Sequence, residues 1–185
     1  FYTNLGALLY KVGQFDEAIK NFQHAIKLEP NNAIVYIILG ATLISKGELD
    51  EAIKNFEQAI NLDPYNADAY YYVGVTLGEN GQFDAAIKKY TKAIKLDPKN
   101  ADIYYELANT LREQHKYKKA ITNYEYAIKL DPNNADFYYA LGLAFAKNKQ
   151  FDQAIKTYRH ALKLNPNLTE AQDQLDSALK ASNDD

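Results

Sequence analysis

Apolar residues recur along this chain at steps of three and four, the period of an amphipathic α-helix, and they nowhere alternate as in a strand. One such run covers residues 33–43 and stops before Gly47. The next covers residues 49–62 and stops before Pro64, because proline cannot continue a helix. Short connections of this kind favour antiparallel helical hairpins. The pattern therefore predicts an all-α protein.

The helical hairpin is repeated along the chain. All five prolines stand 34 residues apart, at Pro30, Pro64, Pro98, Pro132 and Pro166. A fixed period of this length is typical of solenoids, in which each unit buries its core against its neighbours. We therefore expect one elongated array over residues 1–185. Its predicted repeats are 1–32 (N-terminally truncated), 33–66, 67–100, 101–134 and 135–168.

Polar residues stand near the expected helix starts. An Asn precedes each later first helix, where its side chain can accept a hydrogen bond from a backbone N–H; these residues are Asn32, Asn66, Asn100 and Asn134. We expect aspartates to cap the second helices in the same way: Asp16, Asp50, Asp84 and Asp152.

The two ends of the chain differ. Thr169 and Gln172 have the spacing of a capping box, which predicts a further helix over residues 169–182 and a tail at 183–185. That helix has one apolar and one polar face, as expected of a cap that covers the last repeat. Phe1 and Tyr2 instead enter the first helix without a polar cap. We therefore expect a longer array upstream, or self-association through this N-terminal end.

Each repeat carries an aromatic residue, a Leu-Gly pair and, downstream, an Ala, an aromatic residue and a second Ala. The first aromatic residues are Tyr2, Tyr36, Tyr70, Tyr104 and Tyr138. The pairs are Leu5-Gly6, Leu39-Gly40, Val73-Gly74, Leu107-Ala108 and Leu141-Gly142. The downstream sets are Ala18-Phe22-Ala25, Ala52-Phe56-Ala59, Ala86-Tyr90-Ala93, Ala120-Tyr124-Ala127 and Ala154-Tyr158-Ala161. Small residues let helix backbones approach closely, and the aromatic rings fill the remaining space.

This pattern resembles the tetratricopeptide repeat. The chain departs from it where the family's second Tyr is replaced by Leu9, Leu43, Leu77, Leu111 and Phe145. The resemblance covers nearly the whole chain. It implies a right-handed superhelical α-solenoid of antiparallel helix pairs, with five tandem repeats and a C-terminal capping helix.

The fourth repeat departs from the pattern of the other repeats at the turn between its two helices. His115 takes the position of Gly13, Gly47 and Gly81, and Lys118 takes the position of the expected capping Asp. We expect this turn to be the least stable of the five, because a residue other than Gly resists a positive φ. An alternative use of its basic cluster, a contact for an acidic partner, stays open; the cluster comprises Arg112, His115, Lys116, Lys118 and Lys119.

Composition excludes several functions. The formal net charge is −3, from 21 basic and 24 acidic residues, which argues against a nucleic-acid binder. The longest apolar run, residues 33–44, is shorter than the ~20 residues of a membrane-spanning helix, so we expect no membrane insertion. The chain has no cysteine and opens without a basic and then apolar signal pattern, and we expect a cytoplasmic protein.

We find no catalytic chemistry in the sequence. Only three histidines are present, and stacking of the repeats separates His24 from His160. No glycine-rich phosphate loop is present. We therefore expect no catalytic residue, no metal site and no cofactor, and a protein that is not an enzyme.

Function is then expected on the surface that stacking leaves open. The resemblance implies that the first helices line a concave groove that binds a peptide or protein partner. The helical period places these residues there: Ile34, Ile37, Ile44, Asp68, Tyr71, Tyr72, Asp102, Tyr105, Glu106, Asn109, Arg112, Asp136 and Tyr139. This set predicts a ligand with apolar side chains in one part and Lys or Arg in another.

Two function classes follow, and one subfamily is excluded. The first is a protein-interaction scaffold, which we favour. The second is a substrate-recognition or assembly segment of a larger enzyme, as in glycosyltransferases that carry similar repeats. No window of three repeats supplies a cation at the positions with which carboxylate-clamp members hold acidic chaperone C-termini. Such a C-terminus is therefore not the expected partner.

Overall fold

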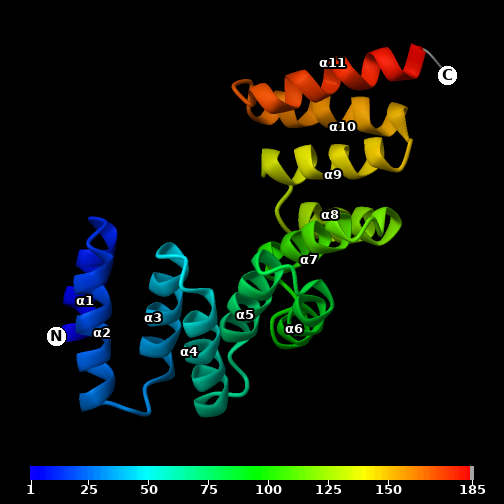
Figure 1. Cartoon of the computed structure of the whole chain (residues 1–185). Helices are drawn as coiled ribbons and strands as arrows, with labels where there is room; N and C mark the ends of the chain where they lie inside the picture. The colour runs from blue at the N-terminus through cyan, green and yellow to red at the C-terminus, as the bar shows by residue number, and fades with distance from the viewer. Residues whose placement is uncertain (184–185) are drawn as a thin grey trace. The chain divides into compact units, whose positions relative to one another are not determined.

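The computed structural model describes residues 1–183 and contains eleven α-helices and no strand in that range (Figure 1). The first helices of the repeats are α1 (Tyr2–Lys11), α3 (Ala33–Ser45), α5 (Ala67–Glu79), α7 (Ala101–Glu113) and α9 (Ala135–Lys147). The second helices are α2 (Phe15–Leu28), α4 (Leu49–Leu62), α6 (Phe83–Leu96), α8 (Tyr117–Leu130) and α10 (Phe151–Leu164), and α11 spans Thr169–Asn183. The predicted all-α class and helix pairing are confirmed. Residues 184–185 of the predicted tail lie outside the described residues.

The chain forms two compact units. Unit 1, Phe1–Pro98, contains α1 to α6, and unit 2, from Lys99 on, contains α7 to α11. Within each unit, every helix packs against the helices before and after it, and successive first helices also touch. This is the packing of a solenoid. A single array over the whole chain and the repeat boundaries stay predictions.

Alanines and aromatic rings form the core of each repeat. In the second repeat, Ala52, Phe56 and Ala59 are completely buried. A Cβ atom placed on Gly40 would lie 2.6 Å from Cε1 of the Phe56 ring, so this close approach of α3 to α4 requires glycine. The sequence pattern of small residues opposite aromatic rings therefore reflects helix packing.

The turns inside the helix pairs require a left-handed backbone. Gly13, Gly47 and Gly81 have φ between 72° and 78°, and His115 has φ of 57°. The positive φ expected at His115 is thus confirmed. Lys149, in the fifth repeat, has φ of 60°, which the sequence analysis missed.

The helix caps follow the prediction only in part. Asn66, Asn100 and Asn134 each accept a backbone N–H at 3.0 Å, whereas Asn32 makes no cap bond and donates to Glu29. The expected aspartate caps are wrong. The second helices begin one residue before each aspartate, so Asp16, Asp50, Asp84 and Asp152 lie inside the first turn and favour the helix dipole instead. Lys118 consequently does not occupy a capping position.

The last helix covers the end of unit 2. Ala171, Leu175 and Ala178 of α11 are buried, and the last two pack with Tyr158 of α10. The expected capping box is wrong, because Thr169 is the first residue of α11 and its hydroxyl donates to Glu170 at 3.2 Å. The Gln172 amide donates to Asp176 at 2.9 Å, within the exposed face.

Helix α1 and the residues that flank it present apolar side chains to solvent. Leu8 of α1 is 62% exposed, and the flanking Phe1 and Val12 are 89% and 71% exposed. The self-association through this end stays a prediction.

Candidate peptide-binding surface

Helix α3 combines a buried face with an uncharged exposed one. Val35, Leu39 and Leu43 are buried against neighbouring helices. Ile34 is 62% exposed, and Ile37 and Ile44 are half-buried. No charged residue occurs anywhere in α3. An apolar surface thus remains on the side of the helix that packing leaves open.

The next first helix of unit 1, α5, adds aromatic rings and one carboxylate. Tyr72 stacks on Phe56 with ring centroids 5.4 Å apart, and Tyr71 meets Tyr72 edge-on at 5.2 Å. Burial, and then the nearby Asp68, raise the pKa of the Tyr72 hydroxyl. Asp68 itself is exposed in the first turn of α5. The two helices that carry the predicted residues of unit 1, α3 and α5, are in contact.

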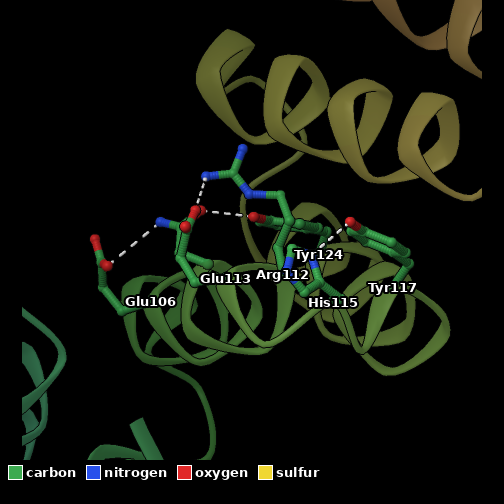
Figure 2. Close-up of polar contacts among 7 residues, drawn as sticks. Glu106, Arg112, Glu113, His115, Tyr117 and Tyr124 are labelled. Carbon is green, nitrogen blue, oxygen red and sulfur yellow. Dashed lines mark hydrogen bonds and ion pairs between the residues drawn. The ribbon is translucent and has the colours of Figure 1, made fainter. Parts of the chain in front are cut away.

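In unit 2, a chain of hydrogen bonds holds the polar face of α7 (Figure 2). The Tyr124 hydroxyl donates to Asn109 Oδ1 at 2.6 Å, and Asn109 Nδ2 donates to Glu106 Oε2 at 3.3 Å. Tyr124 is completely buried, whereas Asn109 and Glu106 are half-buried. The bond from Tyr124 fixes the Asn109 amide, and Asn109 in turn positions the Glu106 carboxylate.

Arg112 lies at the other end of α7, on the side that faces α9 (Figure 2). Its Nη2 lies 3.2 Å from Oε1 of Glu113. Burial raises the pKa of four tyrosine hydroxyls, and the positive charge of Arg112 partly opposes this rise; the four residues are Tyr105, Tyr124, Tyr139 and Tyr158. The four hydroxyls therefore stay protonated at neutral pH.

Two buried polar atoms of unit 2 have no hydrogen-bond partner within the described part of the chain. They are Arg112 Nε and the Tyr158 hydroxyl. Tyr158 is the counterpart of Tyr124, but the position of Asn109 is held by Leu143 in its repeat. The fifth repeat therefore lacks the acceptor that satisfies the tyrosine in the fourth.

The remaining predicted residues of unit 2 lie on α7 and α9. Tyr105 stacks on Phe137 of α9 with centroids 4.9 Å apart, and Tyr139 packs near Tyr158 at 6.2 Å. Asp102 and Asp136 are exposed in the first turns of their helices. The structure thus leaves every predicted groove residue at least partly accessible.

A hollow outside this set escaped the sequence analysis. It measures about 740 Å³ and lies between α2 and the pair α3–α4. Ile19, Ile26, Tyr36, Leu39 and Leu43 form its apolar part, and charged residues surround it: Asp16, Glu17, Lys20, Lys27, Lys46, Glu48 and Glu51. Lys46 Nζ lies 2.7 Å from both Asp16 and Glu48 across this hollow. No repeat pattern marks it, because it depends on how two neighbouring repeats meet.

The histidines pack rather than assemble a site. The His24 ring packs against the Tyr2 ring with centroids 4.1 Å apart, and the His160 ring packs against the Tyr138 ring with centroids 4.2 Å apart. Within residues 1–183 no group of three or more His, Cys, Asp or Glu side chains is placed to hold a metal ion. In the same part of the chain, none of the helices has the length and apolar character needed to cross a membrane.

Comparisons with known proteins agree with this architecture. The family model for the Cilia and flagella-associated protein 70 C-terminal domain, a tetratricopeptide repeat model, matches residues 1–184. The crystal structure of MamA is 30% identical, with a TM-score of 0.79, and the match covers 89% of this chain and 96% of MamA. A search of curated protein sequences gives no significant match.

Two further structures show the same fold at lower identity. YrrB, described as a TPR protein with an unusual peptide-binding site, is 23% identical with a TM-score of 0.75; the match covers 93% of this chain and 89% of YrrB. A chain of the APC/C hetero-tetramer Cut9-Hcn1 is also 23% identical, with a TM-score of 0.84; the match covers 96% of this chain and 36% of that chain.

Proposed function

The chain belongs to the tetratricopeptide repeat family, and we propose that it is a non-enzymatic scaffold that binds a peptide segment of a partner protein through its first helices. The observation that carries this proposal is the apolar surface of α3. A helix without any charge is normally covered on all sides, yet Ile34 is largely exposed and Ile37 and Ile44 are half-exposed. Contiguous exposed isoleucines mark a binding surface more often than scattered ones.

The polar face of unit 2 adds a second recognition element. Asp102, Glu106 and Asp136 are accessible there, partly offset by Arg112. Because carboxylates select cations, the surface of unit 2 suits a ligand segment with Lys or Arg side chains, whereas the surface of α3 in unit 1 suits a segment with apolar side chains. YrrB supports this use of the fold through its described peptide-binding site, although its low identity transfers no residues.

The test selects peptides from a random displayed library on the intact chain and measures the best binder by calorimetry. Ile34→Ser changes an exposed side chain and leaves the core intact, so we expect about tenfold weaker binding at any salt concentration. Asp102→Ala with Asp136→Ala should mainly reduce the salt dependence of binding. The matched control is Lys88→Ala with Lys95→Ala, two exposed lysines of α6. If the control abolished binding while the other variants left it unchanged, the first-helix surface would not be the binding site.

A further inference from the structure

The five turns inside the helix pairs carry opposite charges in the two units. These turns, with the first residues of each second helix, cover residues 11–17, 45–51 and 79–85 in unit 1 and 113–119 and 147–153 in unit 2. All their charged side chains belong to exposed residues. They are equivalent segments, 34 residues apart, so the difference between them is not a difference of fold.

The turns of unit 1 form an acidic edge. It has seven carboxylates against two lysines, a net charge of −5: Asp16, Glu17, Glu48, Asp50, Glu51, Glu79 and Asp84, with Lys11 and Lys46. Lys46 pairs with Asp16 and Glu48, and Glu51 pairs with Lys54 at 2.9 Å. In the described part of the chain, Glu17, Asp50 and Glu79 form no ion pair, so much of the negative charge is uncompensated.

The turns of unit 2 form a basic edge. It has five lysines against two carboxylates, a net charge of +3: Lys116, Lys118, Lys119, Lys147 and Lys149, with Glu113 and Asp152. Helices alternate in direction within the unit, so the α7–α8 and α9–α10 turns lie at the same side of it (Figure 1). Among residues 1–183, Lys118, Lys119, Lys147 and Lys149 have no carboxylate within ion-pair distance.

The backbone of the basic edge is kept under strain. His115 and Lys149 hold a positive φ at the position where all three turns of unit 1 have glycine. A left-handed conformation is sterically unfavourable for a residue with a side chain. The His115 ring is used locally, because its Nδ1 lies 2.8 Å from the Tyr117 hydroxyl. Lys149 has no such contact, and its strained position adds only an exposed positive charge. Strain of this kind is typical of binding surfaces.

We propose that the basic edge of unit 2 binds the acidic edge of unit 1 in a second copy of this chain. The charges are complementary, and both edges are built from equivalent segments of the same 34-residue repeat. The acidic edge also borders the hollow between α2 and α3–α4. A lysine side chain fits there with its stem on Ile19 and Leu39 and its ammonium group near Glu17 or Glu51.

Such a contact joins two different surfaces, so it is heterologous. A bound pair keeps one free acidic edge and one free basic edge, which either bind further copies or bind each other. Because every pair lies at the surface, association is driven by charge and weakens with salt.

The experiment is sedimentation velocity of the chain over a concentration series at about 20 mM and about 500 mM NaCl. We expect association at low salt that disappears at high salt. Lys118→Glu with Lys149→Glu changes the net charge of the basic edge from +3 to −1, and Asp50→Lys with Glu79→Lys changes that of the acidic edge from −5 to −1. Each double variant alone should associate about tenfold more weakly or worse, because the attraction between the edges becomes repulsion in the first variant and is much reduced in the second. Mixing the two variants should restore pairwise association, because the unchanged acidic edge of the first variant meets the unchanged basic edge of the second. Lys88→Glu with Lys95→Glu, on exposed positions of α6, makes the same charge change away from the edges and should have little effect.

Several results would overturn this proposal. A chain that stays monomeric at low salt, or association unchanged in both double variants, would show that the edges do not bind each other. Association that persists at high salt would show that the apolar N-terminal end, and not the charged edges, drives self-association. Binding of poly-glutamate by a chain that stays monomeric, lost in the Lys118→Glu and Lys149→Glu variant, would assign the basic edge to a different acidic protein.

Discussion

Helices α3 and α7 hold the same place in their repeats but present different surfaces. Their buried positions match: Val35, Leu39, Thr42 and Leu43 in α3 correspond to Ile103, Leu107, Thr110 and Leu111 in α7, and all are buried. Their open faces differ, because α3 has Ile38, Ala41 and Ile44 at the positions where α7 has Glu106, Asn109 and Arg112. Packing therefore constrains one face of a first helix and leaves the other free to vary with the ligand.

The largest effect should come from the rings beneath the two helices. Phe56 under α3 and Tyr124 under α7 are both completely buried. Replacing either by Ala should lower the free energy of unfolding by about 3–5 kcal/mol, because a buried aromatic ring leaves a large cavity. Urea denaturation of Phe56→Ala and Tyr124→Ala measures this. If one substitution cost less than half as much as the other, the two frameworks would not be equivalent.

A smaller effect should separate the fourth repeat from the fifth. Tyr124→Phe removes the hydroxyl that donates to Asn109, which should lower the free energy of unfolding by about 1–2 kcal/mol. Tyr158→Phe is the matched control, since the Tyr158 hydroxyl has no hydrogen-bond partner among residues 1–183. Removing an unsatisfied buried hydroxyl should leave stability unchanged or raise it slightly. Equal losses in the two variants would show that the Tyr124 to Asn109 bond contributes nothing specific.

The sequence predicts the framework of α3 and α7 better than their polar contacts. The 34-residue period suffices for the helix pairs, because the same small and aromatic residues pack in each repeat, even where Ala108, His115 and Lys149 replace glycine. The bond from Tyr124 to Asn109 could not be predicted, since it depends on two side chains from different helices meeting. The signal available was Asn109 itself, a polar residue where the neighbouring repeats have Val75 and Leu143.

The aspartate caps were mispredicted for a local reason. Second helices begin directly after a short turn, and the residues just before them, such as Gln14 and Glu48, make no side-chain cap bond. The backbone of the positive-φ turn therefore starts these helices without the usual capping residue.

Which exposed residues bind a ligand depends on the ligand as well as on the chain, so the sequence of the chain carries only part of that information.

The same buried hydroxyls should make the stability of the chain depend on pH in the alkaline range. Burial raises the pKa of Tyr124 and Tyr158 above the ordinary value of about 10. Below about pH 10 both hydroxyls are protonated in the folded and unfolded states, so they add no pH dependence. Above it, the unfolded chain releases these protons and the folded chain keeps them, so stability falls by up to about 1.4 kcal/mol per pH unit for each tyrosine. The difference between the urea midpoints measured at about pH 8 and about pH 11 should therefore be smaller in a Tyr124→Phe and Tyr158→Phe double variant than in the unmodified chain.

The smallest effect concerns the turns that follow α7 and α9. His115→Gly and Lys149→Gly should each raise the free energy of unfolding by about 0.5–1 kcal/mol, because glycine adopts the positive φ at these positions without steric cost. The gain at His115 should be the smaller, since that variant also loses the contact with the Tyr117 hydroxyl. Gly47→Ala, in the turn after α3, is the matched reverse change: nothing lies within 4 Å of its Cβ position, so any loss reports backbone strain alone. Shifts in denaturant midpoint of opposite sign would confirm that unit 2 carries strain that unit 1 avoids. No gain in either glycine variant would show that the surrounding helices already compensate for it.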